Sequence, residues 1–397
     1  MAVNSVHPKL FPSLYELRKL KKHFLPENIE TTAKVNLQDM LNDTAASILQ
    51  LSNITENTEA TLTCNWGLDG SAGHSTYKQK FSNPLFTDEY LFFIAFCPLK
   101  LVENTSGQKI WENPRPGSTL YCRPIKFIFS KETKDLVKNE EAEIQSQIDV
   151  LLPYNNVAEN HKIKVSYIML LTMIDGIICN TLTDTSAASK CFICGATPKQ
   201  MNTEVGIQKL PKVENYRFGL SSLHLWIRCF ECLLHISYKL PFKCWQVRSE
   251  NKETFETRKK EIQASFKQKM GLLVDKPKPG FGSTNGGNTA RKFFNNPEIS
   301  SKITGIDVDL INNFSLILRV VASGKEINNS SFRHLLQITR QQYLSLYSWY
   351  YMPRSVHKLL VHGADIISYF DLPIGLLTEE ALEARHKEIQ KHRLHHT

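Results

Sequence analysis

The sequence predicts an α/β fold in which a sheet domain is joined to a larger, mainly helical part. Segments rich in β-forming residues follow one another from Ala60 to Ser130. A helical pattern of Glu and Lys over residues 131–152 is then followed by the apolar run Val165 to Ile178, so strand, helix and strand alternate. After about residue 220, apolar residues recur at the helical spacings of three and four.

The composition is that of a globular protein with a polyanionic partner. The chain has 397 residues, of which 42% are hydrophobic and 22% charged, and its formal net charge is +9. This excess favours nucleic acid as a partner over an acidic membrane surface. No apolar stretch approaches the roughly 20 residues that cross a bilayer, and the N-terminus lacks the apolar core of a secretory signal. We therefore expect no membrane segment and no secretion.

The nine cysteines indicate a reducing compartment. They are too few and too odd in number to form a disulfide framework in a chain of this length. Their thiols are therefore available to bind a metal.

The elements can be assigned in order along the chain. Two helical patterns, Leu14 to His23 and Leu37 to Leu51, form a lead-in segment. Strands are expected at 61–66, 90–96, 121–130 and 165–178, with a helix at 131–152. Further helices are expected at 223–239, 252–270, 293–323, 332–350, 356–361 and 379–392. Residues 275–288 are rich in Pro and Gly and predict an exposed loop.

Four units follow from these assignments. They are a helical lead-in over 1–58, a sheet domain over 59–185, a helical insertion over 186–370 and a final helical segment over 371–397. The sheet domain is therefore expected to be separated from the last helix by the insertion.

Two aspartates interrupt runs that otherwise look buried, and glycine follows each of them. They are Asp69, before Gly70, and Asp175, before Gly176. A carboxylate at the end of a central strand is costly to bury unless a cation meets it, and a divalent metal is a suitable partner. Asp-Gly is also among the commonest turn pairs, so from the residues alone a simple turn is at least as good an interpretation.

A metal site of another kind is indicated by Cys191 and Cys194, which form a C-x₂-C pair followed by glycine. Two pairs could complete it. Cys229 and Cys232 lie in a strongly apolar helix, where cysteines usually fill the core. The pair His357 and His362 is five residues apart, so the two side chains would diverge by about 140° in an ideal helix and the turn must relax. The residues alone leave both options open.

Candidate DNA contacts cluster around the Pro/Gly loop. Lysines and arginines are frequent from 248 to 292, although a solvated helix face explains many of those in 252–261. Asn288, Arg291 and Lys292 follow the glycines and offer amide and cationic donors to phosphate. Trp245 and Trp349 could stack on an unpaired base, but their apolar surroundings make packing the default.

A succession of motifs resembles the Transib family of DNA transposases, which is related to the catalytic subunit of the V(D)J recombinase. The motifs occur in the family's order and extend almost to the C-terminus. They are Asp69 to Ser75, Thr172 to Gly176, Cys191 to Lys199, Gly287 to Phe294, Trp349 to Pro353, His357 to Ala364 and Leu372 to Gly375.

The resemblance implies a site and a fold. It implies a ribonuclease-H-like fold of the DDE type, interrupted by a zinc-binding helical insertion. The catalytic carboxylates would be Asp69, Asp175 and Glu383, holding two Mg²⁺ or Mn²⁺ ions. From the residues alone, Glu379, Glu380 and Glu383 cannot be separated on their acidic helical turn. The resemblance favours Glu383, which directly precedes Ala384 to Lys387.

The resemblance also implies ligands for zinc and contacts to DNA. It favours His357 and His362, together with Cys191 and Cys194, as a structural zinc site. It implies that Asn288, Arg291 and Lys292 lie beside the active site. His224 stands where related transposases carry a histidine near the scissile phosphate, although a core histidine is an equal interpretation of this residue.

The function implied is cut-and-paste DNA transposition in the nucleus. Such an enzyme binds double-stranded DNA at terminal inverted repeats and acts as a homodimer. It nicks the transposon ends, forms hairpins on the flanking DNA and transfers the 3′ ends into target DNA. Compared with the family, the chain looks truncated at both ends, so two alternatives are carried. One is a DNA-binding protein without activity, and the other is a domesticated metal-dependent DNA endonuclease.

Overall fold

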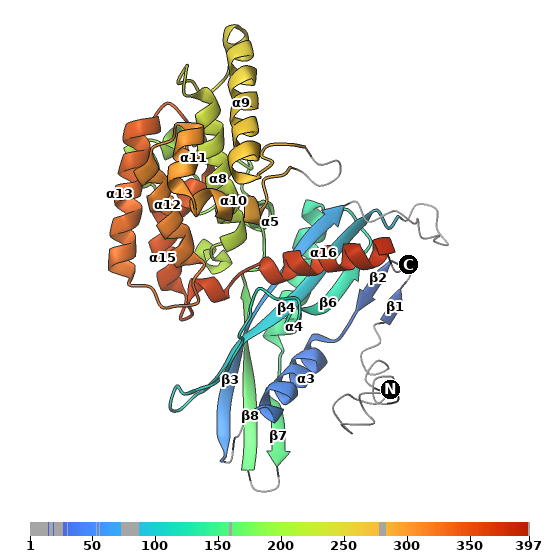
Figure 1. Cartoon of the computed structure of the whole chain (residues 1–397). Helices are drawn as coiled ribbons and strands as arrows, with labels where there is room; N and C mark the ends of the chain where they lie inside the picture. Colours follow the sequence, from blue (N-terminus) through green and yellow to red (C-terminus); the bar gives the residue numbers. More distant parts are fainter. Residues whose placement is uncertain are drawn as a thin grey trace, which may run out of the picture.

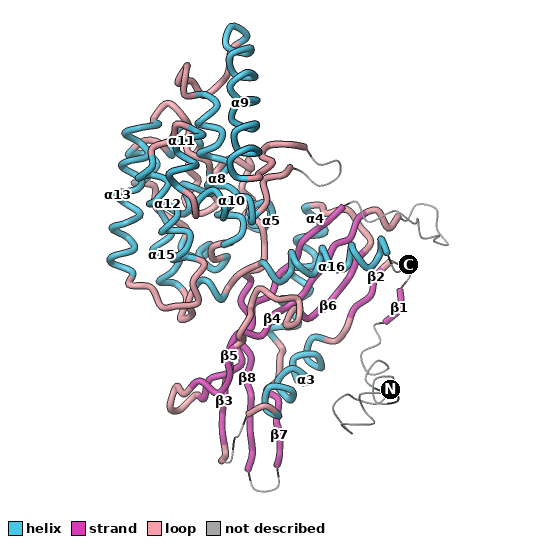
Figure 2. Tube along the Cα trace, viewed as in Figure 1, coloured by secondary structure: helices cyan, strands magenta, loops and turns pink. Residues whose placement is uncertain are grey.

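The computed structural model is a mixed α/β protein in which the strands and most of the helices form two separate regions (Figures 1 and 2). The helix expected over Leu14 to His23 lies largely outside the described residues, as do Gly73, His74 and Ser75. The structure describes residues 15, 19, 27–29, 31–52, 54, 56–72, 87–158, 161–277 and 283–395.

The sheet has eight strands, with the order β1-β2-β6-β4-β3-β8-β7 and with β5 paired to β4. Strands β3 and β8 are parallel, and the other pairs are antiparallel. The bounds are β1 (Glu27–Ile29), β2 (Thr32–Lys34), β3 (Thr58–Ala72), β4 (Tyr90–Glu103), β5 (Lys109–Glu112), β6 (Arg123–Ile128), β7 (Tyr154–Ala158) and β8 (His161–Leu171). The strands expected at 61–66, 90–96 and 121–130 are confirmed. Because β1 and β2 extend the sheet at β6, the lead-in segment is physically part of it.

The strand expected from Val165 to Ile178 is too long. Strand β8 ends at Leu171, and helix α5 (Gly176–Leu182) begins after Asp175. The carboxylate of Asp175 accepts hydrogen bonds from the backbone N–H groups of Ile177 and Ile178, which caps the helix. A continuous apolar run does not reveal this change from strand to helix.

The two faces of the sheet are covered by different helices. On β4, Phe92, Ile94 and Phe96 belong to the core that includes α3 (Leu37–Gln50) and α4 (Lys134–Asp149). The alternating residues Phe93, Ala95 and Cys97 pack with Ala381 and Leu382 of α16 (Glu380–His395). Figure 1 shows α16 crossing the sheet. The last helix of the chain therefore packs on the first strands of the sheet domain.

The helices from α6 to η4 form the larger region at the other end of the molecule (Figure 1). The expected helices at 223–239, 252–270, 332–350 and 379–392 are confirmed, with small shifts at their ends. The bounds are α6 (Pro198–Met201), α7 (Glu204–Ile207), η1 (Val213–Phe218), α8 (Ser222–Lys239), η2 (Ser249–Asn251), α9 (Lys252–Met270), α10 (Gly287–Phe294), α11 (Pro297–Thr304), α12 (Val308–Val321), α13 (Asn329–Tyr347), α14 (Arg354–His357), η3 (Lys358–His362), α15 (Gly363–Tyr369) and η4 (Ile374–Leu376).

The single helix expected over 293–323 is wrong, because this stretch contains the end of α10 and all of α11 and α12. Pro297 occupies the first turn of α11, where its missing N–H is tolerated. Gly305 ends α11 in a left-handed conformation with φ 76°, and the side chain of Asp307 caps α12. The apolar spacing continues through both breaks, which hides them in the sequence.

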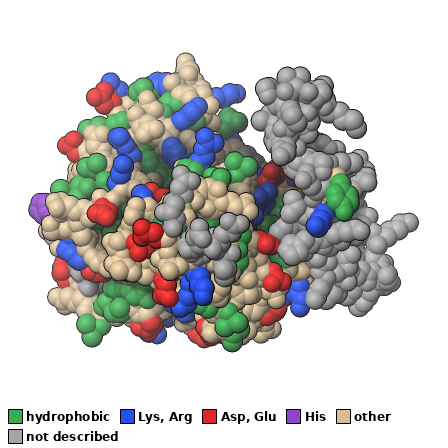
Figure 3. Space-filling model, turned by 90° about the horizontal axis from the view of Figure 1, so that it is seen from below, with side chains coloured by type: hydrophobic (Ala, Val, Ile, Leu, Met, Phe, Trp, Pro, Cys, Tyr) green, Lys and Arg blue, Asp and Glu red, His purple; other side chains and the backbone are tan. Residues whose placement is uncertain are grey.

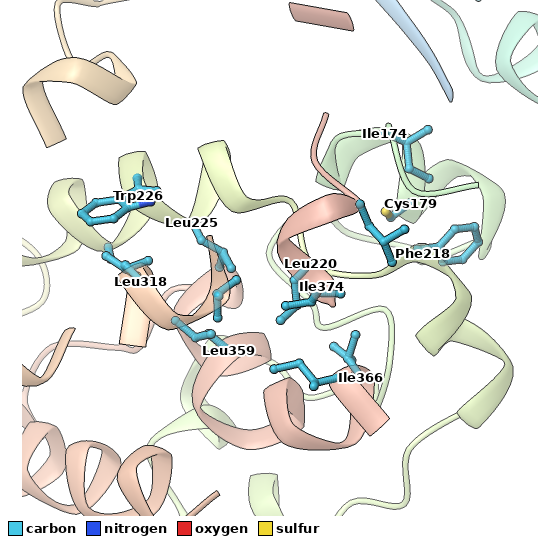
Figure 4. Close-up of a cluster of buried hydrophobic side chains, with 14 of the residues drawn as sticks. Ile174, Cys179, Phe218, Leu220, Leu225, Trp226, Leu318, Leu359, Ile366 and Ile374 are labelled. Atoms are coloured by element: carbon cyan, nitrogen blue, oxygen red, sulfur yellow. The ribbon is translucent and has the colours of Figure 1, made fainter. Parts of the chain in front are cut away.

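One apolar core joins the segments that carry the candidate site residues. Ile174, one residue before Asp175, lies in the same core as Leu220 and Leu225 at the start of α8. Ile374, which precedes α16, belongs to it as well, and Figure 4 shows these side chains together. Packing in the helical region therefore helps to position the segments that carry Asp175 and Glu383.

The described helices include no single one that is long and apolar enough to cross a membrane. By length and composition alone, the pair 354–369 and 374–392 would pass together, but it is bent by 91°. On the face drawn in Figure 3, lysine and arginine side chains are scattered among acidic ones.

The close crossing of β3 and the segment after β8 gives a test of the fold. A Cβ atom on the buried Gly67 would lie 1.9 Å from the carbonyl oxygen of Met173. We expect Gly67→Ala to destabilise the protein by about 1–3 kcal/mol, since backbone must move to admit the methyl group. The midpoint of chemical denaturation measures this effect. Gly324→Ala is the control, because its Cβ would make only ordinary contact with Leu376; equal midpoints for both variants would contradict the packing described.

Candidate functional site

Asp69, Asp175 and Glu383 lie on three different elements around one end of the parallel strand pair. Asp69 is near the end of β3, Asp175 caps α5 after β8, and Glu383 is in the first turn of α16. Leu68 packs in the core beneath α3 and α4, so alternation along β3 directs Asp69 to the opposite face, where α16 lies. Since β3 and β8 are parallel, their carboxyl ends meet at the same edge.

Asp69 lies close enough to both other carboxylates for their charges to act on it. Burial raises the pKa of Asp69 well above its usual range, and the charges of Glu383 and Asp175 raise it further. The side chain of Asp69 is 21% exposed, and among the described residues its nearest basic group is Nδ1 of His386, 3.5 Å from Oδ2. A group that is mostly buried and faces negative charge is well placed to receive a cation.

Glu132 is a fourth carboxylate at this place, and the sequence did not indicate it. Its Oε2 accepts a hydrogen bond of 3.0 Å from the backbone N–H of Gly70. Burial raises the pKa of Glu132, and the charge of Asp175 adds to the increase. Glu132 stands in a charged stretch just before α4, where nothing in the pattern separates it from an ordinary solvated glutamate.

The three glutamates that the sequence could not separate have different surroundings. Glu379 is buried, and its Oε1 accepts hydrogen bonds from the hydroxyl of Ser221 and from the backbone N–H of His224. Glu380 pairs with Arg291. Glu383 is half-buried and lies near Asp69. The geometry therefore favours Glu383 as the residue that faces the two aspartates.

His224 connects Glu379 to Glu383. Its Nδ1 lies 3.2 Å from Oε1 of Glu379, and its Nε2 lies 4.0 Å from Oε1 of Glu383. Burial alone would lower the pKa of His224, but the hydrogen bond to Glu379 and the charges of both glutamates raise it above its ordinary value. The core interpretation of His224 is therefore incomplete, because this side chain is 27% exposed and faces a candidate site residue.

The other candidate DNA contacts lie on α10. Asn288 and Lys292 are exposed, whereas Arg291 is half-buried, pairs with Glu380 and lies over the ring of Trp226. A Cβ on Gly287 would meet the side chain of Leu223 at 2.5 Å, so the close approach at this glycine is between α10 and α8. Gly286 has open space around it.

The two tryptophans are packed, as their apolar surroundings indicated. The ring centroid of Trp245 lies 4.7 Å from that of Tyr350 and 4.9 Å from that of Tyr351. Trp349 packs edge-on against Tyr347 and Tyr350. Neither ring is presented for stacking on a base in this conformation.

Cys191, Cys194, His357 and His362 come together although the two pairs are far apart in the sequence. One ligand atom from each lies within 4.8 Å of the others, and among the described residues this is the one group close enough to hold a single metal ion. The carboxylates do not form such a group. Nε2 of His357 lies 3.4 Å from Sγ of Cys194, so this nitrogen faces the cysteine pair. Nε2 of His362 is buried and has no hydrogen-bond partner among the described residues.

Local helix geometry explains how two histidines five residues apart can meet. Residues Lys358–His362 form a π-helix, whose i→i+5 hydrogen bonds widen the turn. The chain then continues as α15, so the helix expected at 356–361 extends farther than predicted. The relaxation of the last turn that the spacing required is thus present.

The alternative pair is in the core. Cys229 and Cys232 are buried in α8, and Sγ of Cys232 lies 3.6 Å from the hydroxyl of Tyr343. Burial raises the pKa of both thiols. In contrast, the Cys191 thiol hydrogen-bonds to Cys194 and lowers its pKa, and His357 and His362 lower it further.

Comparisons with known proteins add little to the geometry of the site. No protein-family model matches the sequence, and a search of curated proteins finds no match. Among solved structures, the Drosophila P element transposase strand transfer complex matches with a TM-score of 0.33 and 10% sequence identity. The match covers 99% of this chain and 86% of that chain. This similarity is too low for a conclusion about fold or function.

The pair formed by His224 and Glu379 predicts a pH dependence of stability. Because the pKa of His224 is raised, its contribution is complete below its unfolded value of about 6.5 and is lost as pH rises through the folded pKa. Because the pKa of Glu379 is lowered, its contribution is complete above about 4.5 and is lost as pH falls through the folded pKa. His224→Gln should therefore reduce the free energy of unfolding most between these two values.

Denaturation across a pH series measures this difference. His334→Gln, at an exposed position on α13, is the matched control. A loss of stability in His224→Gln that is the same at every pH would show that the ion pair is not its source.

Proposed function

We propose that this chain is a metal-dependent DNA enzyme of the DDE type, similar to the cut-and-paste transposases of the Transib family. The observation that carries the proposal is that the charges of both Asp175 and Glu383 act on the mostly buried Asp69. Carboxylates held together in this way repel unless a cation offsets their charge. Hard divalent cations such as Mg²⁺ or Mn²⁺ prefer carboxylate oxygens.

We propose further that the sheet is of the ribonuclease-H-like type. The strands β3, β4 and β6 are antiparallel neighbours, and α4 then leads to β8, which is parallel to β3; this arrangement supports the interpretation. So does the position of Glu383, which lies on the last helix, after the whole helical region. The sheet would then be a nuclease core, and 186–370 an insertion into it.

Asp69, Asp175 and Glu383 would hold the cations, and Glu132 lies close enough to influence them. Two divalent ions held by carboxylates stabilise the attacking and leaving oxygens during displacement at phosphorus. The fold supports this role by fixing each carboxylate on a different rigid element.

The surrounding residues would orient the DNA. Glu379 fixes the ring of His224 through Nδ1, which leaves Nε2 directed toward Glu383 and the space beside it. A protonated Nε2–H there can donate to a phosphate oxygen. Asn288, Arg291 and Lys292 on α10 would bind the backbone farther out, with Arg291 exchanging Glu380 for phosphate.

The proposed substrates are terminal inverted repeats and target DNA, and the working form is a homodimer in the nucleus. The reactions would be nicking, hairpin formation on the flanking DNA and transfer of the 3′ ends. A metal-dependent endonuclease with the same carboxylates would share the first of these reactions and lack the last.

We propose that Cys191, Cys194, His357 and His362 bind one structural Zn²⁺. The two cysteines follow α5, which Asp175 caps, and the two histidines lie in the helix that precedes α16. Zinc at this place would tie together the segments next to Asp175 and Glu383, and so would stabilise the site without taking part in the reaction.

The proposal predicts that Asp69→Asn, Asp175→Asn and Glu383→Gln each abolish Mg²⁺-dependent nicking of supercoiled plasmid while DNA binding is retained. Removal of one charged ligand weakens the hold on the cations without touching the basic surfaces. Nicking is followed on gels and binding by fluorescence anisotropy.

Glu388→Gln is the control on the same helix, because Glu388 pairs with Arg385 and not with the aspartates. Full nicking activity in any one of the three variants would remove that residue from the proposed triad. Strand transfer of a pre-cut end then separates a transposase from an endonuclease.

The zinc proposal predicts that purified Cys191→Ser loses zinc and unfolds at a lower temperature, whereas Cys229→Ser keeps its zinc. The reason is that Cys229, on α8, is buried in the apolar core and does not belong to the group of four possible zinc ligands. Metal analysis of both proteins measures this, and loss of zinc from the Cys229 variant alone would overturn the assignment.

A further inference from the structure

A pocket with several basic side chains adjoins Asp175 on the side of the helical region. Its lining includes Asp175, Gly176, His224, Arg228, Arg354 and Lys358. These residues come from α5, α8, α14 and η3, so the pocket lies where the sheet domain meets the helices. His224 belongs both to this pocket and to the surroundings of Glu383. The pocket is therefore continuous with the candidate active site.

Arg354 contributes a half-buried guanidinium to the lining of the pocket. Its Nη1 is buried and has no hydrogen-bond partner among the described residues, and its Nη2 lies 2.7 Å from where a Cβ on Gly176 would be. Burial lowers the pKa of this guanidinium, which shows how costly its charge is at this place. Asp175 is near enough to act on it electrostatically, but the two form no ion pair in the described part of the chain.

Arg228 and Lys358 place two more charges at different depths. Arg228 is 53% exposed and is held by Glu231 at 2.7 Å, so it stands at the rim. Lys358 is buried, with Nζ 3.4 Å from the carbonyl oxygen of Gly219 and 5.3 Å from the centre of the Phe192 ring. The lining of the pocket therefore includes one exposed, one half-buried and one buried basic side chain.

We propose that this pocket binds a backbone phosphate of the DNA strand, next to the phosphate that would lie at the carboxylates. The partner class follows from the donors, because guanidinium groups bind phosphate oxygens through paired N–H groups, and a phosphate satisfies the orphaned Nη1 of Arg354. The opening toward Asp175 and His224 fixes its place relative to the reaction.

This inference rests on the proposed function, because it places a second phosphate of the same DNA strand in a part of the same site. It adds Arg228, Arg354 and Lys358 to the residues that contact DNA. None of them belongs to the basic stretch around the Pro/Gly loop.

The experiment measures binding of a short fluorescent DNA duplex in EDTA, so that neither divalent metal nor catalysis is needed. We expect Arg228→Gln and Arg354→Gln each to weaken binding by about tenfold, as for loss of a charge-assisted hydrogen bond. The slope of log affinity against log salt should fall by about one for each variant, because one fewer phosphate is neutralised.

Arg319→Gln is the matched control. Arg319 is exposed on α12, so this variant has the same net charge as the others but leaves the pocket unchanged. Its affinity and salt slope should equal those of the wild type.

Two outcomes would overturn the inference. One is wild-type affinity and salt slope in both pocket variants. The other is weaker binding by Arg354→Gln alone, with a lower unfolding temperature for this variant and wild-type affinity for Arg228→Gln. In that case Arg354 would be a structural counter-charge. Weakened binding in both variants, combined with no Mg²⁺-dependent nicking by the wild type, would support the pocket and contradict the proposed enzyme instead.

Discussion

The repulsion among carboxylates around Asp69 is the constraint on which the functional interpretation depends. A strand end, a helix cap and the last helix bring Asp69, Asp175 and Glu383 together, and Glu132 adds a fourth acidic group. Packing alone gives no reason to collect negative charge at a mostly buried place, because burial already disfavours each ionised carboxylate. The apolar core that includes Ile174 and Ile374 supplies the stability that holds them there.

Basic groups approach this acidic centre without neutralising it. His224 is bound mainly by Glu379 and only faces Glu383 from 4.0 Å, and Arg354 is near Asp175 without forming an ion pair. Nδ1 of His386 lies 3.5 Å from Oδ2 of Asp69. Such an arrangement keeps both charges available, the acidic ones for cations and the basic ones for phosphate. A fully formed ion pair would leave neither the acidic group free to bind a cation nor the basic group free to bind a phosphate.

Much of the fold could be predicted from the sequence because its signals are local. The β-rich run from Ala60 to Ser130 and the apolar spacing in α8, α9 and α13 each correspond to elements in the structure. The breaks in 293–323 were missed because Pro297 and Gly305 interrupt the backbone without interrupting the apolar pattern. The end of β8 was missed for the same reason, since apolar residues continue past Leu171.

The candidate site was predictable where a residue is unusual for its surroundings, and not where its role depends on distant neighbours. Asp69 and Asp175 stand out in apolar runs, whereas Glu132 looks like any glutamate before a helix. Only the family resemblance separates Glu383 from Glu379 in the sequence, whereas in the structure Glu379 accepts hydrogen bonds from Ser221 and His224. The histidine pair required a π-helix, which spacing demanded but no sequence pattern specified.

The most direct test of the central claim is a crystal structure of the protein grown with Mn²⁺ and short DNA, with anomalous scattering used to locate the manganese. The account predicts manganese peaks coordinated by Asp69, Asp175 and Glu383, at distances close to 2.1 Å typical of small divalent ions. Manganese bound elsewhere, or carboxylates that stay apart with no peak between them, would contradict it.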